Sequence, residues 1–182
     1  MRWLPLLLLF LASCSSPTGE EGIVDQTAAA PSTPLPEVTD MKLSSTAFQP
    51  NQTIPAKYTC DGQGISPPLS VSGIPPATKA FALVVEDPDA PMGIFTHWVA
   101  WNIPVRPQIG EDADFTYQGK NSFGDIGYGG PCPPNGKHRY VFKLFALDAQ
   151  LSLYPSADRK QLESAMEGHI LAQAELVGVY SR

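Results

Sequence analysis

Proline and glycine interrupt this chain throughout its length, with 19 prolines and 15 glycines among 182 residues. Because proline cannot continue a helix and glycine marks turns, the apolar segments between them are short. Strands are expected at 79–86, 97–103 and 138–147, with a candidate final strand at 176–180 and a weaker one at 69–71. The pattern predicts a mainly β domain.

One helix is expected late in the chain. Ser156 can cap it, and Asp158 lies in its first turn, where a carboxylate is favourable. Gly168 can end it, and residues 167–174 are expected to form a second short turn or helix. Apolar residues recur at helical spacing between these limits, at Leu162, Ala165 and Met166. Many short strands with one or two short peripheral helices favour a β-sandwich over a doubly wound fold.

The first 13 residues have the features of a secretory signal peptide. Arg2 gives a positive start, and residues 3–12 form an apolar run shorter than the about 20 residues that a membrane helix needs. The run ends in Leu-Ala-Ser-Cys, which resembles the bacterial lipobox and predicts lipid attachment at Cys14. A plain signal peptide followed by an incidental cysteine is the alternative.

Residues 14–40 are expected to form the lipidated cysteine and a flexible tether, and residues 41–182 one folded domain. Proline and small polar residues dominate the tether, and these cannot bury enough apolar surface to offset the entropy of ordering. Ser15, not Asp, follows the cysteine, which by resemblance to Gram-negative sorting indicates the outer membrane facing the periplasm if the source is Gram-negative. We therefore expect an exported protein that is lipid-anchored to a membrane.

Charge and cysteine content narrow the expected partners and compartment. Without Arg2, the chain carries 11 basic and 18 acidic residues, a net charge of about −7, so nucleic acid is not an expected partner. Export would place Cys60 and Cys132 in an oxidising compartment, where an even pair of cysteines favours a disulfide. Two buried free thiols are the alternative.

Two acidic or histidine-bearing segments lie at strand ends. Asp87 and Asp89 belong to Asp-Pro-Asp-Ala-Pro, which directly follows an expected strand, where an ordinary Asp-Pro turn is the plain alternative. His97 begins the next strand, at the rim of an apolar face. The two-residue period of a strand places it on the face of Val99, Trp101 and Ile103.

A third segment combines a glycine-rich loop with a strand. Residues 127–134 read Gly-Tyr-Gly-Gly-Pro-Cys-Pro-Pro, and glycines of this kind expose amide donors and allow a ligand to approach closely. Arg139 points away from the apolar face of the strand that follows. That face carries His138, Tyr140, Phe142 and Leu144.

Together these segments resemble the phosphatidylethanolamine-binding protein family, also called Raf kinase inhibitor-like proteins, and most closely its bacterial branch. The resemblance covers about residues 41–182. Its principal motifs are Asp-Pro-Asp-Ala-Pro at 87–91, His97-Trp98, and Gly-Lys-His-Arg-Tyr at 136–140. Flanking matches are at 58–62, 66–69, 127–134 and 165–169.

The resemblance implies a Greek-key-like β-sandwich with a small anion pocket at one end. In the family, the counterpart of Asp89 helps to hold a loop, which the resemblance implies is done here through Arg139, while Pro91 and Gly130 shape the rim. The pocket takes phosphate-like or carboxylate groups, including the phosphoryl head of phosphatidylethanolamine in animal members. The implied ligand-binding set is Asp87, Asp89, Pro91, His97, Gly130, His138 and Tyr140.

The sequence therefore predicts a membrane-anchored binding protein with a pocket for a small anion or a phospholipid headgroup, and no catalytic residue or cofactor. Two alternatives are an inhibitor or adaptor of an unknown partner protein and, less favoured, a hydrolase that uses the His/Asp pocket. The segment between Pro91 and His97 is short, and the C-terminal extension of animal members is absent from this sequence. Lipid-tail and kinase-inhibitor roles are therefore not carried over.

Metal and serine-hydrolase chemistry receive little support. Two histidines and a carboxylate could form a facial metal triad, but His-Glu-x-x-His and Cys-x-x-Cys motifs are missing, and no metal is expected. The Gly-x-Ser-x-Gly elbow of serine hydrolases is also missing, and Ser122 is expected to be a turn residue. His169 is expected to be a packed or helix-capping histidine.

Overall fold

The computed structural model describes residues 40–182. The expected signal peptide at 1–13 and the expected lipidation at Cys14 lie outside the described residues, as does the expected tether up to residue 39. Within the described part of the chain, no helix combines the length and apolar character needed to cross a membrane.

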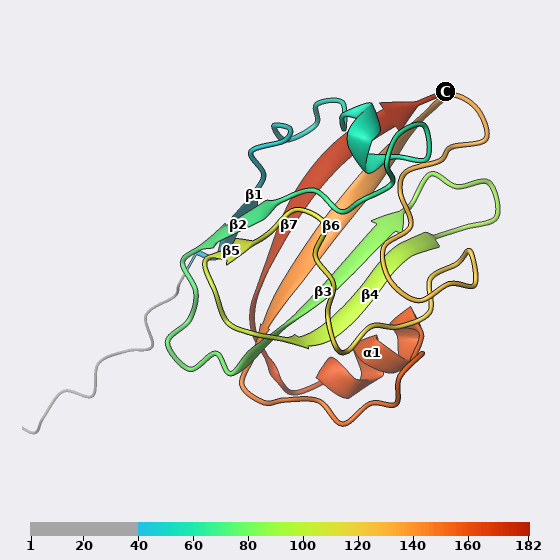
Figure 1. The fold of residues 1–182 in the computed structure, drawn as a ribbon. Helices are drawn as coiled ribbons and strands as arrows, with labels where there is room; N and C mark the ends of the chain where they lie inside the picture. The colour runs from blue at the N-terminus through green and yellow to red at the C-terminus, as the bar shows by residue number, and fades with distance from the viewer. Residues whose placement is uncertain (1–39) are drawn as a thin grey trace, which may run out of the picture. The chain divides into compact units, whose positions relative to one another are not determined.

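Two antiparallel sheets make up the fold, and the smaller lies over part of the larger (Figure 1). The larger sheet has the order β4-β3-β6-β7, with β3 at Ala80–Asp87, β4 at Phe95–Ile103, β6 at Lys137–Leu147 and β7 at Ile170–Ser181. The smaller sheet has the order β1-β2-β5, with β1 at Lys42–Ser44, β2 at Leu69–Ser72 and β5 at Gln108–Ile109. The prediction of a mainly β fold is confirmed.

The larger sheet is covered on both faces. Every residue of β3 is buried, and its alternate side chains enter two different apolar clusters, as the pleat of a strand requires. The cluster toward the smaller sheet includes Leu43, Leu69, Phe81, Leu83, Phe142 and Leu144. The cluster on the opposite face includes Val84, Val99, Trp101, Leu162 and Met166. The last two residues belong to the helix α1, so α1 covers the face opposite the smaller sheet.

The helix α1 spans Arg159–Met166, and its N-terminal cap is Asp158 rather than the expected Ser156. The Asp158 side chain accepts a bond from the Gln161 amide, while the Gln161 side chain accepts one from the Asp158 amide. Ser156 lies in the preceding turn with a positive φ of 73°. The expected end at Gly168 is close, since the C-cap is Glu167 and Gly168 has a φ of 78°.

The expected turn or helix at 167–174 is confirmed only as a turn at 167–169, because residues 170–174 belong to β7. This strand pairs with β6 from Leu147↔Ile170 to Lys137↔Ser181. The length of the partner strand therefore sets the length of β7, and a local sequence pattern does not contain that information. A short 3-10 helix, η1 at Ala56–Tyr58, is the other helical element within residues 40–182.

The face assigned to His97 is also wrong. Val85 pairs with Trp98, whereas Glu86 pairs with Thr96, so His97 is the extra residue of a β-bulge. The bulge turns the His97 ring toward Tyr140 in the cluster under the smaller sheet, away from Val99 and Trp101. A second register shift returns Ile103 to that same cluster.

The expected pairing of Cys60 with Cys132 is confirmed. The two cysteines form a disulfide with Cα atoms 5.4 Å apart, across 72 positions of sequence. The bond joins the segment after η1 to the glycine-rich loop that precedes β6.

We predict that replacing Leu162 with alanine lowers the free energy of unfolding by about 2–5 kcal/mol. Leu162 is fully buried between α1 and the larger sheet, so its removal leaves a cavity. Urea denaturation measures the effect. The matched control is Lys160→Ala on the exposed side of the same helix, which we expect to change the free energy by less than about 0.5 kcal/mol. Equal effects of the two substitutions would contradict this packing.

Candidate functional site

The candidate site lies at the end of the larger sheet where β3 stops and β6 begins. Asp87 is the last residue of β3, and His138 is the second residue of the neighbouring β6. The Nδ1 atom of His138 lies 2.6 Å from Oδ2 of Asp87, and both side chains are buried, at 9% and 5% exposed. The carboxylate therefore fixes the orientation of the imidazole.

The His97 ring reaches the same end of the sheet from the β-bulge of β4. Its Nδ1 atom lies 2.7 Å from the carbonyl oxygen of Gly129, and the Gly129 amide donates back to the His97 carbonyl at 2.8 Å. The edge or face of the ring also contacts three aromatic rings, with centroid distances of 5.1–5.4 Å, from Phe95, Phe123 and Tyr140. The ring is thus held by one hydrogen bond and by packing.

These contacts define the hydrogen positions on both imidazoles. A carbonyl or carboxylate oxygen accepts a hydrogen bond, so Nδ1 of His97 and Nδ1 of His138 each carry a proton, as assigned from their partners. A neutral ring then presents the lone pair of Nε2, and a protonated ring presents a second N–H donor. Each Nε2 atom is the part of its ring that remains for a ligand.

Electrostatics favour the neutral form of His97 when no ligand is bound. Burial lowers its pKa, although the bond to Gly129 and the charge of Asp87 partly oppose this shift. An anion that contacts Nε2 of His97 would therefore bind together with a proton.

Tyr140 supplies a further donor beside the two histidines. Its side chain is fully buried, and its hydroxyl has no hydrogen-bond partner within residues 40–182. Burial, reinforced by the nearby charge of Asp87, raises the pKa of Tyr140. The hydroxyl therefore keeps its proton and can donate a hydrogen bond to a ligand oxygen atom.

Asp89 holds the loop after β3, because both of its carboxylate oxygens accept hydrogen bonds from Arg139 and are not directed at a ligand. Its Oδ1 accepts from Nη2 of Arg139 at 2.7 Å, and its Oδ2 accepts from Nε at 2.8 Å and from the Arg139 amide at 2.9 Å. The Asp89 amide also donates to Oδ1 of Asp87 at 2.8 Å. This loop is thus tied both to β6 and to the carboxylate that orients His138.

The two predicted rim residues occupy different environments. Gly130 is packed against the backbone of Thr59, and a Cβ atom there would lie 2.9 Å from the Thr59 carbonyl carbon, so a side chain does not fit without movement. Pro91 is exposed in the turn between β3 and β4. Of the predicted set, Asp87, His97, His138 and Tyr140 come together, with Gly130 nearby.

Sequence reasoning missed two contributors to the site. The Gly129 carbonyl fixes His97, and the Phe123 ring packs on the same imidazole. The buried Asn121 shapes this loop, because its Oδ1 accepts from the amides of Phe123 and Asp125. An Asn-x-Phe-Gly turn is visible in the sequence, but its position against His97 depends on the tertiary fold.

Two other candidates lie outside the pocket. Ser122 exchanges hydrogen bonds with the Thr96 backbone and acts as a turn residue, as expected. His169 lies after α1, half-exposed, with Nδ1 2.9 Å from Oδ1 of Asp148. Across residues 40–182, no group of three His, Cys, Asp or Glu side chains is arranged to hold a metal ion.

Comparison with known proteins identifies the family. The family model described as phosphatidylethanolamine-binding protein matches residues 44–181. A UPF0098 protein of Pyrococcus horikoshii is 51% identical over 157 residues, covering 80% of this chain and 79% of that protein. A UPF0098 protein of Pyrococcus abyssi is 43% identical over 196 residues, covering 100% and 99%.

Solved structures agree with this assignment. The crystal structure of a putative phosphatidylethanolamine-binding protein homologue from Chlamydia trachomatis is 46% identical, with a TM-score of 0.76, and covers 79% of this chain and 99% of that one. Escherichia coli YbcL, described as a new member of the mammalian family, is 30% identical, with a TM-score of 0.73 and coverage of 78% and 98%. The chain belongs to the phosphatidylethanolamine-binding protein family.

The Asp89–Arg139 contact predicts a specific loss of stability in acid. The hydrogen bonds from Arg139 lower the pKa of Asp89 from 3.8 to about 2. A lowered pKa in the folded state contributes stability above pH 3.8 that is lost as the pH falls toward about 2. The native protein should therefore be more stable than Asp89→Asn at neutral pH, and this difference should shrink across that range in denaturant titrations.

Asp125→Asn is the matched control for this measurement, because Asp125 is an exposed carboxylate in a loop. A stability difference between the native protein and Asp89→Asn that stays constant down to pH 2 would contradict the role given to Arg139.

Proposed function

We propose that this protein binds a small anion, a phosphate, a carboxylate or a phospholipid-headgroup-like group, through Asp87, His97, His138 and Tyr140. One observation carries the proposal. Both imidazoles bond to internal acceptors through Nδ1, and the His97 ring packs against Tyr140, whose buried hydroxyl has no partner in the described chain. Buried polar groups are normally paired, so such a hydroxyl marks a place where a ligand oxygen is expected.

The chemistry of these groups favours an anion over a cation. A protonated imidazole and a phenol are donors, and together they can surround an oxygen that carries negative charge. Asp87 is already bonded to His138 and to the Asp89 amide, so its role is to orient and to balance charge. A hollow of about 650 Å³ borders His138 and is also lined by Lys137 and Arg139, although His97 does not line it.

Membership of a family described as phosphatidylethanolamine-binding supports an anionic headgroup as the ligand class. Because burial lowers the pKa of His97, the ligand-free protein lacks part of the positive charge that an anion needs. Anion affinity should therefore increase as the pH falls, since a proton then becomes available to the His97 ring.

Titration with sulfate tests this proposal, because sulfate keeps its charge throughout the pH range in which histidine titrates. We expect calorimetry to give roughly tenfold tighter binding at about pH 5 than at about pH 8. His138→Ala and Asp87→Ala should each weaken binding at pH 5 by roughly tenfold or more. His169→Ala is the control, since His169 pairs with Asp148 outside the pocket.

Native mass spectrometry of the purified protein then identifies the ligand that it carries. A discrete anion that is present in the native protein and lost from both pocket variants would name the ligand class. Affinity that is flat from about pH 5 to about pH 8 would contradict the role of the histidines.

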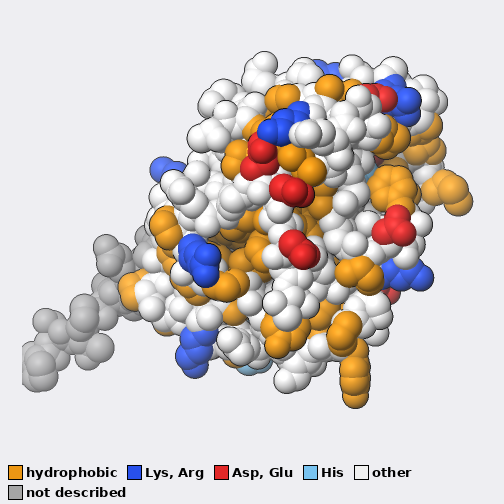
Figure 2. All heavy atoms as spheres, viewed as in Figure 1, with side chains coloured by type: hydrophobic (Ala, Val, Ile, Leu, Met, Phe, Trp, Pro, Cys, Tyr) orange, Lys and Arg blue, Asp and Glu red, His pale blue; other side chains and the backbone are white. Residues whose placement is uncertain are grey.

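An adaptor or inhibitor role is the second candidate, and one observation favours it. Hydrophobic side chains gather along the side of the molecule where β3 and β4 are connected, among charged residues (Figure 2). Met92, Ile94, Phe123 and Ile126 are 49–101% exposed in the two loops near the pocket. A pocket found empty in the native protein and in both variants would favour contact of this surface with a partner protein.

We further propose that the protein is exported and attached to a membrane through a lipid on Cys14, with the anion pocket held beyond the tether. The short apolar run and the Leu-Ala-Ser-Cys sequence support this proposal. Several acyl chains on one cysteine anchor a protein firmly, because each buried methylene contributes about 0.8 kcal/mol.

Replacing Cys14 with serine should move the protein from the membrane fraction to the soluble fraction. Mass spectrometry of the native N-terminal peptide should find Cys14 as the first residue and carrying lipid. The substitution spares the Cys60–Cys132 disulfide, so circular dichroism should be unchanged. Equal recovery of both proteins with membranes would contradict lipid anchoring.

A further inference from the structure

We propose that the Cys60–Cys132 disulfide is a site of thiol–disulfide exchange that controls the anion pocket, with Cys60 as the sulfur that an incoming thiolate attacks. The inference rests partly on the proposed function, since the pocket is what it would regulate. Its chemical partner is a dithiol reductant, which supplies the two electrons. Three features of the structure support it: the loop that the bond holds, the exposure of the two cysteines, and a cation beside one sulfur.

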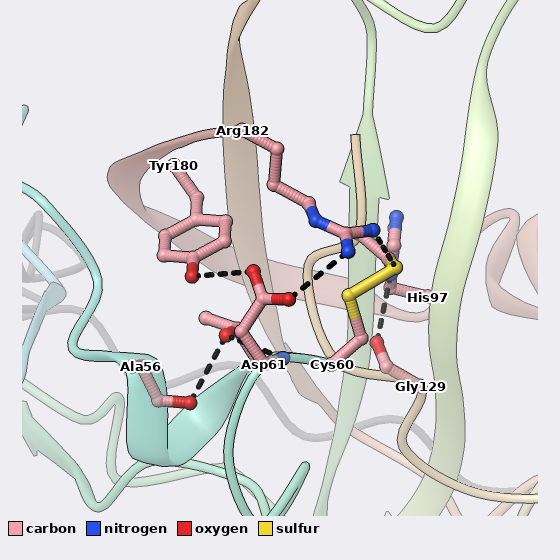
Figure 3. The surroundings of a disulfide bond; sticks show 9 residues. Ala56, Cys60, Asp61, His97, Gly129, Tyr180 and Arg182 are labelled. Atoms are coloured by element: carbon pink, nitrogen blue, oxygen red, sulfur yellow. Dashed lines mark hydrogen bonds and ion pairs between the residues drawn. A yellow bond between two sulfur atoms is a disulfide. The ribbon is translucent and has the colours of Figure 1, made fainter. Parts of the chain in front are cut away.

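The disulfide holds the loop on which His97 depends. Gly129, whose carbonyl accepts from His97 at 2.7 Å, lies three positions before Cys132. Figure 3 shows the disulfide with His97 and Gly129 behind it. Two hydrogen bonds support the same loop, from the Cys60 amide to the Pro131 carbonyl at 3.1 Å and from the Tyr128 hydroxyl to the Tyr58 carbonyl at 3.0 Å.

Removing the covalent link would leave the sheets intact but release this loop. Neither cysteine belongs to a strand of the larger sheet, so its ladders do not depend on the bond. The loop would keep its hydrogen bonds to the Tyr58 and Cys60 backbone and its close packing at Gly130, but without the covalent link the Gly129 carbonyl would move more freely against His97. The hydrogen bond that holds the Nδ1 proton of His97 would then weaken, and the ring would no longer be fixed in one orientation.

The two cysteine residues differ in exposure. Cys60 is exposed, whereas Cys132 is only partly exposed. A thiolate from a dithiol therefore reaches Cys60 more easily, and attack there makes Cys132 the leaving group.

Arg182 makes Cys132 a good leaving group. Its Nη1 donates to Sγ of Cys132 at 3.4 Å, while its Nη2 lies 3.2 Å from Oδ1 of Asp61. Asp61 also accepts from the Tyr180 hydroxyl at 2.8 Å, so the guanidinium is held in place beside the sulfur (Figure 3). A cation next to a sulfur stabilises the thiolate, and a stabilised thiolate leaves faster.

The exchange balances in two steps. A thiolate of the dithiol forms a bond to Sγ of Cys60, the S–S bond breaks, and its electron pair goes to Cys132 as a thiolate beside Arg182. The second thiol of the reductant loses its proton and attacks the reductant's other sulfur, the one bonded to Cys60 in the mixed disulfide. The thiolate released at Cys60 then takes up a proton. The protein gains two electrons, and the dithiol becomes a disulfide.

The test uses the full chain under native conditions, with dithiothreitol as the reductant. Alkylation followed by peptide mass spectrometry measures free thiol at Cys60 and Cys132 separately from Cys14. We expect dithiothreitol to convert both cysteines to free thiols while the circular dichroism spectrum stays unchanged. Arg182→Gln should slow this reduction roughly threefold or more. Lys160→Gln is the control, because it removes a cation from the surface of α1.

Two readouts follow the pocket after reduction. Nitrogen NMR of the His97 ring should show loss of its single fixed tautomer, and sulfate affinity at about pH 5 should fall roughly tenfold. Reoxidation should restore both, which excludes irreversible unfolding as the cause. The Cys60→Ser, Cys132→Ser double variant should behave like the reduced protein.

Three outcomes would overturn the proposal: thiols released only when the sheets unfold, an Arg182→Gln rate equal to that of the native protein, or His97 ring signals unchanged by reduction. The NMR readout keeps this test separate from the proposed function. If the oxidised protein fails to bind sulfate, the anion proposal fails, while the His97 signals still decide whether the disulfide controls the ring.

Discussion

The whole structure depends on a larger sheet that is buried on both faces. Its inner strand β3 has no exposed residue, so it is stable only if apolar groups cover it from two sides. The smaller sheet meets one face and α1 meets the other, which explains why a mainly β protein retains a short helix. The candidate site sits where this double covering ends, at the last residue of β3.

Polar groups at that end are buried, and this constrains them more strongly than an exposed position would. A buried carboxylate or imidazole is costly unless it is paired, and Asp87, His138 and His97 each have an internal partner. These same pairings use up Nδ1 on both rings and leave Nε2 for a ligand. The glycine-rich loop completes the site because its backbone, not its side chains, supplies the acceptor for His97, and the disulfide attaches that loop to the rest of the fold.

The sequence predicted the elements whose patterns are regular. On β6 the two-residue period holds, and Tyr140, Phe142 and Leu144 share a buried face as expected. On β4 the period breaks at a bulge, so His97 was assigned to the wrong face. The helix was expected near its true position, but its cap is Asp158, because Ser156 occupies a left-handed turn. Such local irregularities come from pairing with neighbouring strands and loops.

The sequence by itself determined the mainly β class and the family resemblance, because strand periodicity and spaced motifs are local or countable features. It favoured the pairing of Cys60 with Cys132, which the structure then showed. The support for a signal peptide and for lipidation at Cys14 also comes from the sequence alone. Only the tertiary structure decided which nitrogen of each histidine is occupied, and that the Tyr140 hydroxyl has no hydrogen-bond partner among residues 40–182. The contacts that occupy these nitrogens join residues 32 and 51 positions apart, so the geometry of the folded chain determines them.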